Sequence, residues 1–227
     1  MLEIFRKEVK YSISTVGFNK LRRMLDAVMT PDAHDKDGQG YEVRSLYFDS
    51  SSDSDLTDVL AGLRSKQKVR LRCYDAEAEA FKLEYKCKTG TDSYKKSLTV
   101  SRRDARRMIS GRYGFLMELD DAVAKELYGR LLLGAYGARV VVRYRRIAYI
   151  APMNDVRVTF DYDLGASFDP EALLDPAAVF EPVGYTGSGV LEVKYNAFLP
   201  QYIKDALGKI ELSPSANSKY ALSRLAL

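Results

Sequence analysis

Short segments in which apolar and charged residues alternate are the feature of this sequence that most limits its fold. Five of them are RKEVKY (6–11), KVRLR (68–72), FKLEYKCK (81–88), VRVTFD (156–161) and LEVKY (191–195). Successive side chains of a β-strand point to opposite faces, so alternation with period two predicts strands with one apolar and one ionic face. We therefore expect a fold dominated by half-buried antiparallel strands.

The same alternation, interrupted by turn residues and helix caps, predicts the order of the elements. Strands are expected near residues 3–13, 41–49, 65–74, 80–88, 92–100, 138–150, 155–162 and 189–196. Helices are expected near 18–29, 53–61, 101–111, 119–134, 199–207 and 217–226. The third helix opens with a capping box formed by Ser101 and Asp104.

Eight strands, mostly in hairpin order, can close into a barrel, which removes exposed sheet edges. The lumen of such a barrel holds side chains or one ligand. The expected fold class is therefore α+β: an eight-stranded antiparallel β-barrel tunnel with helices packed on the outside. No linker splits the sequence, so we expect a single domain over residues 1–227.

The ionic strand faces are mostly basic. On one strand Lys68, Arg70 and Arg72 share a face, and each of the other four segments also places at least one cation on its polar face. One interpretation is the solvated face of a β-sandwich, where lysine and glutamate serve solubility. Recurrence on five strands favours cations that line an enclosed space instead. Like charges aligned in a lumen are costly unless a polyanion neutralises them, so the pattern predicts a phosphate-chain ligand.

Three glutamates, Glu8, Glu84 and Glu192, share faces with these cations. Each could simply pair with a neighbouring lysine. Alternatively, one or more of them bind Mn²⁺ or Mg²⁺, hard ions that take carboxylate and phosphate oxygens as ligands. Phosphoryl transfer needs positioning, cations on the phosphate oxygens and a metal, rather than covalent chemistry by the protein. Both interpretations stay open from the residues alone.

Composition argues against several other functions. Lys and Arg number 35 against 31 Asp and Glu, a formal net charge of only +4, which disfavours a broad DNA-binding surface. The polar faces lack the aromatic and basic interleaving of RNA-binding proteins. Two cysteines and one histidine give neither a disulfide framework nor a zinc motif. The low net charge and these polar faces lead us to expect no nucleic-acid partner. Because the sequence has no apolar run of membrane-spanning or signal-peptide length, we expect a cytoplasmic protein with no membrane segment.

Seven segments in this order resemble the VTC (vacuolar transporter chaperone) polyphosphate polymerase domain of the triphosphate tunnel metalloenzyme superfamily. They extend from about Phe5 to about Tyr220 and are RKEVKY, YEVRSLYFD, KVRLR, FKLEYK, RRIAY with VRVTFD, VLEVKY and SKY. The resemblance implies an eight-stranded tunnel with external helices. It also implies growth of inorganic polyphosphate from the γ-phosphate of ATP, with Mn²⁺ or Mg²⁺ as cofactor.

The resemblance further implies roles for individual residues. Glu192, in LEVKY, matches the metal-binding glutamate of the family, and Glu84 and Glu8 are the other candidates for the metal. Alternation alone leaves open which of Arg143, Arg145 and Arg146 faces the tunnel. The implied catalytic cations are Arg70, Arg72, Lys86, Arg157 and Lys194, and the implied phosphate-binding cations are Lys10, Lys95, Arg146 and Lys219.

One departure separates the branches of this superfamily. The related triphosphatases open with Glu-x-Glu-x-Lys, whereas this chain has Arg6, Glu8 and Lys10 at those positions. Loss of the first carboxylate favours a polymerase. Two alternatives stay open: a triphosphatase that hydrolyses tripolyphosphate or a nucleoside triphosphate, and a non-catalytic module that binds polyphosphate or another polyanion.

Overall fold

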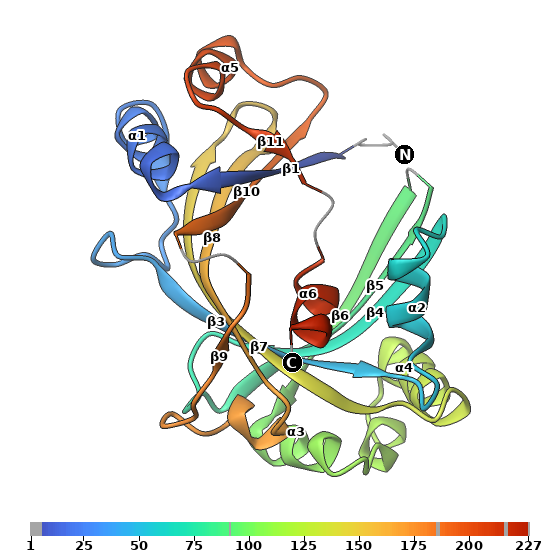
Figure 1. Cartoon of the computed structure of the whole chain (residues 1–227). Helices are drawn as coiled ribbons and strands as arrows, with labels where there is room; N and C mark the ends of the chain where they lie inside the picture. Colours follow the sequence, from blue (N-terminus) through green and yellow to red (C-terminus); the bar gives the residue numbers. More distant parts are fainter. Residues whose placement is uncertain (1–5, 91, 185–186, 216–217, 227) are drawn as a thin grey trace. The chain divides into compact units, whose positions relative to one another are not determined.

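The computed structural model describes residues 6–90, 92–184, 187–215 and 218–226, and its contacts divide the chain into two compact units. Unit 1 comprises Met1–Glu42, Tyr144–Leu164 and Gly184–Asn217. Unit 2 comprises Val43–Arg143, Gly165–Val183 and Ser218–Leu227. Three strands, β3 (Tyr41–Asp49), β7 (Gly137–Ala151) and β8 (Val156–Ser167), contribute residues to both units (Figure 1).

Unit 1 is built on antiparallel pairing of β1 (Arg6–Ser14), β10 (Ser188–Asn196) and β8. The strand order is β11-β1-β10-β8-β7, and β11 (Ser213–Pro214) and β2 (Thr30–Pro31) are two-residue strands that pair with β1 and β7. Helices α1 (Thr15–Asp26) and α5 (Gln201–Gly208) pack on the apolar side, and η2 (Met153–Asp155) is a short 3-10 turn. The core includes Ile13, Leu21, Leu25, Val158, Phe160, Leu191, Val193 and Ile203.

Unit 2 continues the order as β7-β3-β4-β5-β6, with β4 (Ser65–Cys73), β5 (Ala80–Thr89) and β6 (Asp92–Ser101) in a meander. Strand β9 (Glu181–Pro182) pairs with β8. The helical elements are α2 (Ser54–Leu60), α3 (Arg102–Ile109), η1 (Gly114–Met117), α4 (Ala122–Leu133), η3 (Pro170–Leu173) and α6 (Lys219–Leu225). The core includes Leu46, Phe48, Val69, Leu71, Phe81, Leu83, Met108 and Leu127.

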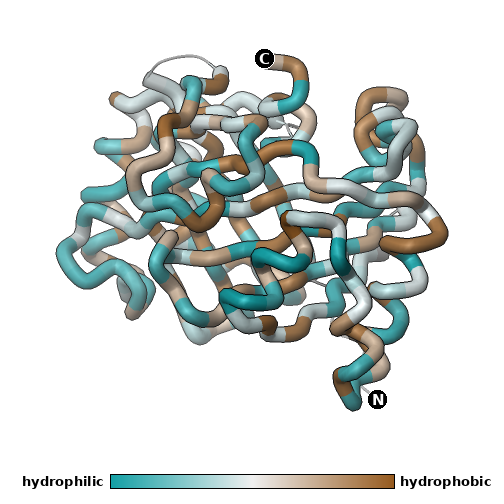
Figure 2. Tube along the Cα trace, turned by 90° about the horizontal axis from the view of Figure 1, so that it is seen from below, coloured by the Kyte–Doolittle hydropathy of each residue, from teal (hydrophilic) through white to brown (hydrophobic). Residues whose placement is uncertain are grey.

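The α+β class and the antiparallel pairing are confirmed. Among the described residues, eight strands of nine or more residues and six α-helices lie where alternation and capping place them. Hydrophobic and hydrophilic residues alternate in short stretches along the chain (Figure 2). Ser101 caps α3 as expected: its Oγ accepts the N–H of Asp104 at 3.1 Å and donates to the Asp104 carboxylate at 2.7 Å.

The expected closed barrel is wrong. The strand order runs from β11 to β6, and within the described ranges no pairing joins these two ends. The outer edge of β1 is instead met by β11, where Ser12 and Tyr11 pair with Ser213 and Pro214. Proline lacks an amide N–H and is typical of edge strands, so β11 ends the sheet on this side.

No helix in the described part of the chain combines the length and the apolar character needed to cross a membrane.

Candidate functional site

The charged face of unit 1 is centred on β1 and β10. Lys10 stands opposite Glu192, and Glu8 stands opposite Lys194. Lys10 Nζ lies 3.1 Å from Glu8 Oε1 and 3.4 Å from Glu192 Oε2. Lys194 Nζ also contacts both glutamates, at 3.6 Å from Glu8 Oε2 and closer to Glu192 Oε1. Each lysine therefore pairs with each glutamate.

These ion pairs outweigh the effect of burial on protonation. Burial alone would raise the pKa of Glu192, which is only 7% exposed, but Lys194 and Lys10 hold that pKa below its ordinary value. Burial alone would likewise lower the pKa of Lys10, but Glu192 and Glu8 hold it above its ordinary value. Both groups are therefore charged at neutral pH, and Glu192 presents an ionised carboxylate.

Two arginines extend this face. Arg146 Nε and Nη2 donate to the carboxylate of Asp161 at 2.6 and 2.7 Å, and Asp161 shares the polar side of β8 with Arg157. Arg157 donates to Asp32 Oδ2 at 2.5 Å and to the hydroxyl of Tyr41 at 3.3 Å. Alternation predicts Asp161 on this side, but nothing in the loop sequence around Asp32 identifies it as the partner of an arginine 125 positions away.

The structure also separates the three neighbouring arginines of β7. Arg146 is the one that reaches the charged face of unit 1, through Asp161. Arg145 Nη2 donates to the backbone carbonyls of Gln39 and Gly40, at 3.1 and 3.3 Å. In unit 2, the guanidinium of Arg143 lies over the ring of Phe180, 5.2 Å from its centroid. Arg44 also lies over this ring, at 5.1 Å.

The charged face of unit 2 is centred on Glu84 of β5. Arg70 Nε lies 2.7 Å from Glu84 Oε2, Arg72 Nη2 lies 3.5 Å from the same oxygen, and Lys95 Nζ lies 3.0 Å from Oε1. Burial would raise the pKa of Glu84, but Arg70 and Lys95 hold it below its ordinary value. One ionised carboxylate thus meets three cations, and this group keeps a positive charge.

Further cations and a tyrosine adjoin this group. Lys86 stands opposite Lys68 on β4 and opposite Lys95 on β6. The hydroxyl of Tyr47 accepts Arg70 Nη1 at 3.1 Å. Burial would raise the pKa of Tyr47, but Arg70, Lys68 and Lys219 bring it below its ordinary value. A lowered pKa in a buried phenol indicates a strongly positive potential, which is what an anion-binding site requires.

Helix α6 carries Lys219 to this face, and several contacts hold the helix in unit 2. The ring of Tyr220 stacks on Tyr47 with 5.1 Å between centroids, and its hydroxyl donates to Asp49 Oδ2 at 2.5 Å. Lys68 Nζ donates to Ser218 Oγ at 2.6 Å, at the start of the helix. Ser218 is also the N-cap of α6, so Lys68 contacts the residue that begins this helix.

The donor atoms near Glu192 suit a hard divalent cation. No cluster of three or more His, Cys, Asp or Glu side chains suited to a metal occurs within the described ranges. Such ions, however, often take one or two carboxylates from the protein and the remaining oxygens from phosphates and water. Glu8 and Glu192 supply two carboxylates, and Thr159, opposite Glu192, has a buried Oγ1 without a hydrogen-bond partner among the described residues. Glu84, by contrast, is a single carboxylate that meets three cations.

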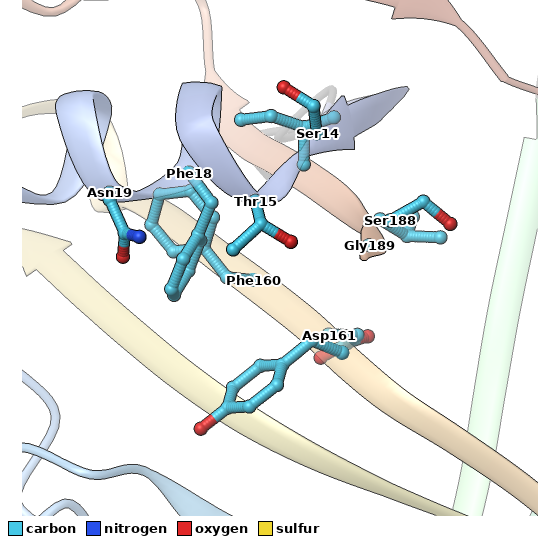
Figure 3. Close-up of a pocket in the computed structure, with 11 residues that line it drawn as sticks. Ser14, Thr15, Phe18, Asn19, Phe160, Asp161, Ser188 and Gly189 are labelled. Atoms are coloured by element: carbon cyan, nitrogen blue, oxygen red, sulfur yellow. The ribbon is translucent and has the colours of Figure 1, made fainter. Parts of the chain in front are cut away.

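A cavity of about 140 Å³ lies elsewhere in unit 1 (Figure 3). Helix α1 contributes Thr15, Phe18 and Asn19 to its wall, and β8 contributes Phe160 and Asp161. Its described lining contains neither lysine nor arginine. This cavity therefore does not have the charge of a phosphate site, and we place the functional site on the charged strand faces.

Comparison with known proteins gives one family match. The family model described as the VTC domain matches residues 5–227. Among curated protein sequences, none matches the chain.

Three solved structures share the fold at low sequence identity. A Hippeastrum protein described as an adenylyl cyclase candidate with dominant triphosphatase activity has a TM-score of 0.60 and 15% identity, covering 99% of this chain and 96% of its own. A proposed adenylate cyclase from Vibrio parahaemolyticus has a TM-score of 0.52 and 11% identity, covering 100% of both chains. One from Bacillus halodurans has a TM-score of 0.50 and 12% identity, covering 94% of this chain and 96% of its own.

Proposed function

The chain belongs to the VTC domain family, and on this premise we propose that it is a metal-dependent polyphosphate polymerase. A terminal oxygen of the growing polyphosphate attacks the γ-phosphorus of ATP. The bond from this phosphorus to the β–γ bridging oxygen breaks, ADP leaves, and the chain is one phosphate longer. The observation that carries the proposal is that each unit places at least two cations against a buried, ionised glutamate on a strand face.

In this proposal the cations of the strand faces act on the phosphates. Loose phosphoryl-transfer transition states spread negative charge over the phosphate oxygens, so catalysis depends on positioned positive charge rather than on a side-chain nucleophile. Arginine suits the task because its planar guanidinium can donate two hydrogen bonds to one phosphate. We assign catalytic contacts to Arg70, Arg72, Lys86, Arg157 and Lys194, and contacts with the phosphate chain to Lys10, Lys95, Arg146 and Lys219.

Glu192 and Glu8 are the residues that would hold Mn²⁺ or Mg²⁺. When bound, the ion supplies positive charge to the β- and γ-phosphate oxygens. Lys10 and Lys194, which pair with both glutamates, keep these carboxylates ionised and aligned. We assign Glu84 to positioning rather than to the metal, because its single carboxylate meets three cations, whose excess positive charge would repel a divalent ion, whereas Glu8 and Glu192 share two lysines.

The second candidate function is a triphosphatase, in which water replaces the polyphosphate acceptor. The similarity to the Hippeastrum protein, whose description includes dominant triphosphatase activity, favours testing it. A third candidate is a binding module without turnover. ATP as substrate agrees with the cytoplasmic location that the sequence leads us to expect.

Incubation with ATP labelled at the γ-phosphate, in the presence of Mn²⁺, separates these functions. The proposal predicts labelled chains that lengthen with time on a gel, and loss of this product with Glu192→Gln. Labelled orthophosphate as the only product would instead make the protein a triphosphatase. Binding of tripolyphosphate without either product would make it a binding module.

A further inference from the structure

The hydroxyl of Thr159 is a buried polar group that lacks a partner in the described part of the chain. Thr159 is 3% exposed, and within the described ranges its Oγ1 has no hydrogen bond. It lies on β8 directly opposite Glu192 of β10. Because Arg157, Thr159 and Asp161 are two residues apart along the strand, Thr159 faces the charged side together with them.

A threonine at this position needs an explanation in terms of a ligand. A buried hydroxyl without a partner destabilises a protein, because it loses its hydrogen bonds to water and gains none. Valine has nearly the same shape and suits a strand equally well, and it avoids this cost. Stability alone would therefore favour valine at residue 159.

The neighbouring charges indicate what kind of ligand the hydroxyl meets. The carboxylate of Glu192 contacts Lys10 and Lys194, and Thr159 is not among its hydrogen-bond donors. A phosphate oxygen placed directly beside Glu192 would be repelled unless a cation stood between them. A divalent cation accepts carboxylate and hydroxyl oxygens together, as in nucleotide-binding loops whose Ser or Thr hydroxyl binds Mg²⁺.

We propose that Thr159 Oγ1 is an oxygen ligand of the divalent cation bound by Glu192. The hydroxyl gives the cation a lone pair, and its proton remains available to a phosphate oxygen on the same ion. This inference rests on the proposed function, since it needs a metal-bound triphosphate at the charged face of unit 1.

Two substitutions test the inference. Thr159→Val removes the hydroxyl and keeps the shape, whereas Thr159→Ser keeps the hydroxyl and serves as the matched control. In EDTA, we expect Thr159→Val to unfold at the same temperature as the wild type or higher, because it loses an unpaired polar group. In calorimetric titrations of Mn²⁺ into protein saturated with tripolyphosphate, we expect its Mn²⁺ affinity to fall by about 10-fold or more. Thr159→Ser should stay close to the wild type.

Two results would overturn the inference. Wild-type Mn²⁺ affinity in Thr159→Val would show that the hydroxyl is not a ligand, and a lower unfolding temperature in EDTA would show that it has a structural partner. If wild-type protein saturated with tripolyphosphate bound no Mn²⁺ at all, the proposed metal-dependent function would fail together with the inference.

Discussion

Arg70 and Glu84 stand opposite each other on β4 and β5, with 2.7 Å between Arg70 Nε and Glu84 Oε2. Arg72 and Lys95 approach the same carboxylate, at 3.5 and 3.0 Å. Glu84 therefore holds cations from β4 and β6 in register while neutralising only one of the three charges. This arrangement makes Glu84 a residue that positions the anion-binding cations of unit 2.

Replacing Glu84 by Gln should lower stability and enlarge the stabilising effect of a polyanion. Without the carboxylate the three cations repel one another, and we expect a loss of about 2 kcal/mol, less than for a fully buried pair because Lys95 is half exposed. Tripolyphosphate should then raise the unfolding temperature of Glu84→Gln more than that of the wild type. Thermal unfolding with and without tripolyphosphate measures both effects.

The control for this substitution is Glu126→Gln, which removes the partly exposed ion pair between Glu126 and Lys96. Its stability should change by less than about 0.5 kcal/mol. A several-fold rise in the Mn²⁺ concentration needed for half-maximal turnover in Glu84→Gln would make Glu84 a metal ligand and contradict the positioning role.

Tyr47 should titrate as a phenol with a pKa below its ordinary value, because Arg70, Lys68 and Lys219 outweigh its burial. In ultraviolet titrations, the wild type should form one tyrosinate at lower pH than Tyr47→Phe does. Bound tripolyphosphate should raise this pKa, since its negative charge offsets the cations. A lowered Tyr47 pKa that tripolyphosphate leaves unchanged would show that the anion binds away from Tyr47.

The raised pKa of the buried Asp55 carboxyl should make the stability of the wild type depend on pH. Asp55 is 1% exposed, its Oδ1 accepts the hydroxyl of Tyr136 at 2.9 Å, and burial raises its pKa to about 6. In the unfolded chain the pKa of Asp55 has its ordinary value of 3.8. Between this pH and about pH 6, the folded protein therefore keeps a proton on Asp55 that the unfolded chain has released. The stability cost of this carboxyl therefore grows from pH 4 to pH 6, roughly, and stays constant at higher pH.

Asp55→Asn should remove this cost. We expect its unfolding temperature to exceed that of the wild type above about pH 6, and the difference to disappear below about pH 4. The exposed Asp120, changed to Asn, provides the control and should give no such trend. A difference between Asp55→Asn and wild type that is constant over this range would contradict the raised pKa.

Alternation predicts local features of the charged faces well. Residues 81–88 show why: Phe81, Leu83 and Tyr85 are buried in the core, whereas Glu84 meets the cations on the other side. Lys95, which the resemblance implies as a phosphate-binding cation, pairs with Glu84, whereas its neighbour Lys96 pairs with Glu126. A side chain's face follows from its own strand, so no knowledge of distant residues is required.

Distant partners are what the sequence does not predict. Asp32 pairs with Arg157, and Tyr220 stacks on Tyr47, yet neither pair has a local signal that joins its members. The closed barrel fails for a related reason. Closure depends on which strand meets the outer edge of β1, and the two-residue strand β11 could not be recognised by periodicity.

The most direct test of the central claim is whether the charged face of each unit is required for triphosphate binding. Calorimetric titration with a non-hydrolysable ATP analogue and Mn²⁺ can measure this in the wild type, in Arg70→Glu and in Lys194→Glu. We predict that both charge reversals abolish binding while leaving the proteins folded by circular dichroism. Wild-type affinity in either variant would exclude that face from the site and contradict the proposed polymerase.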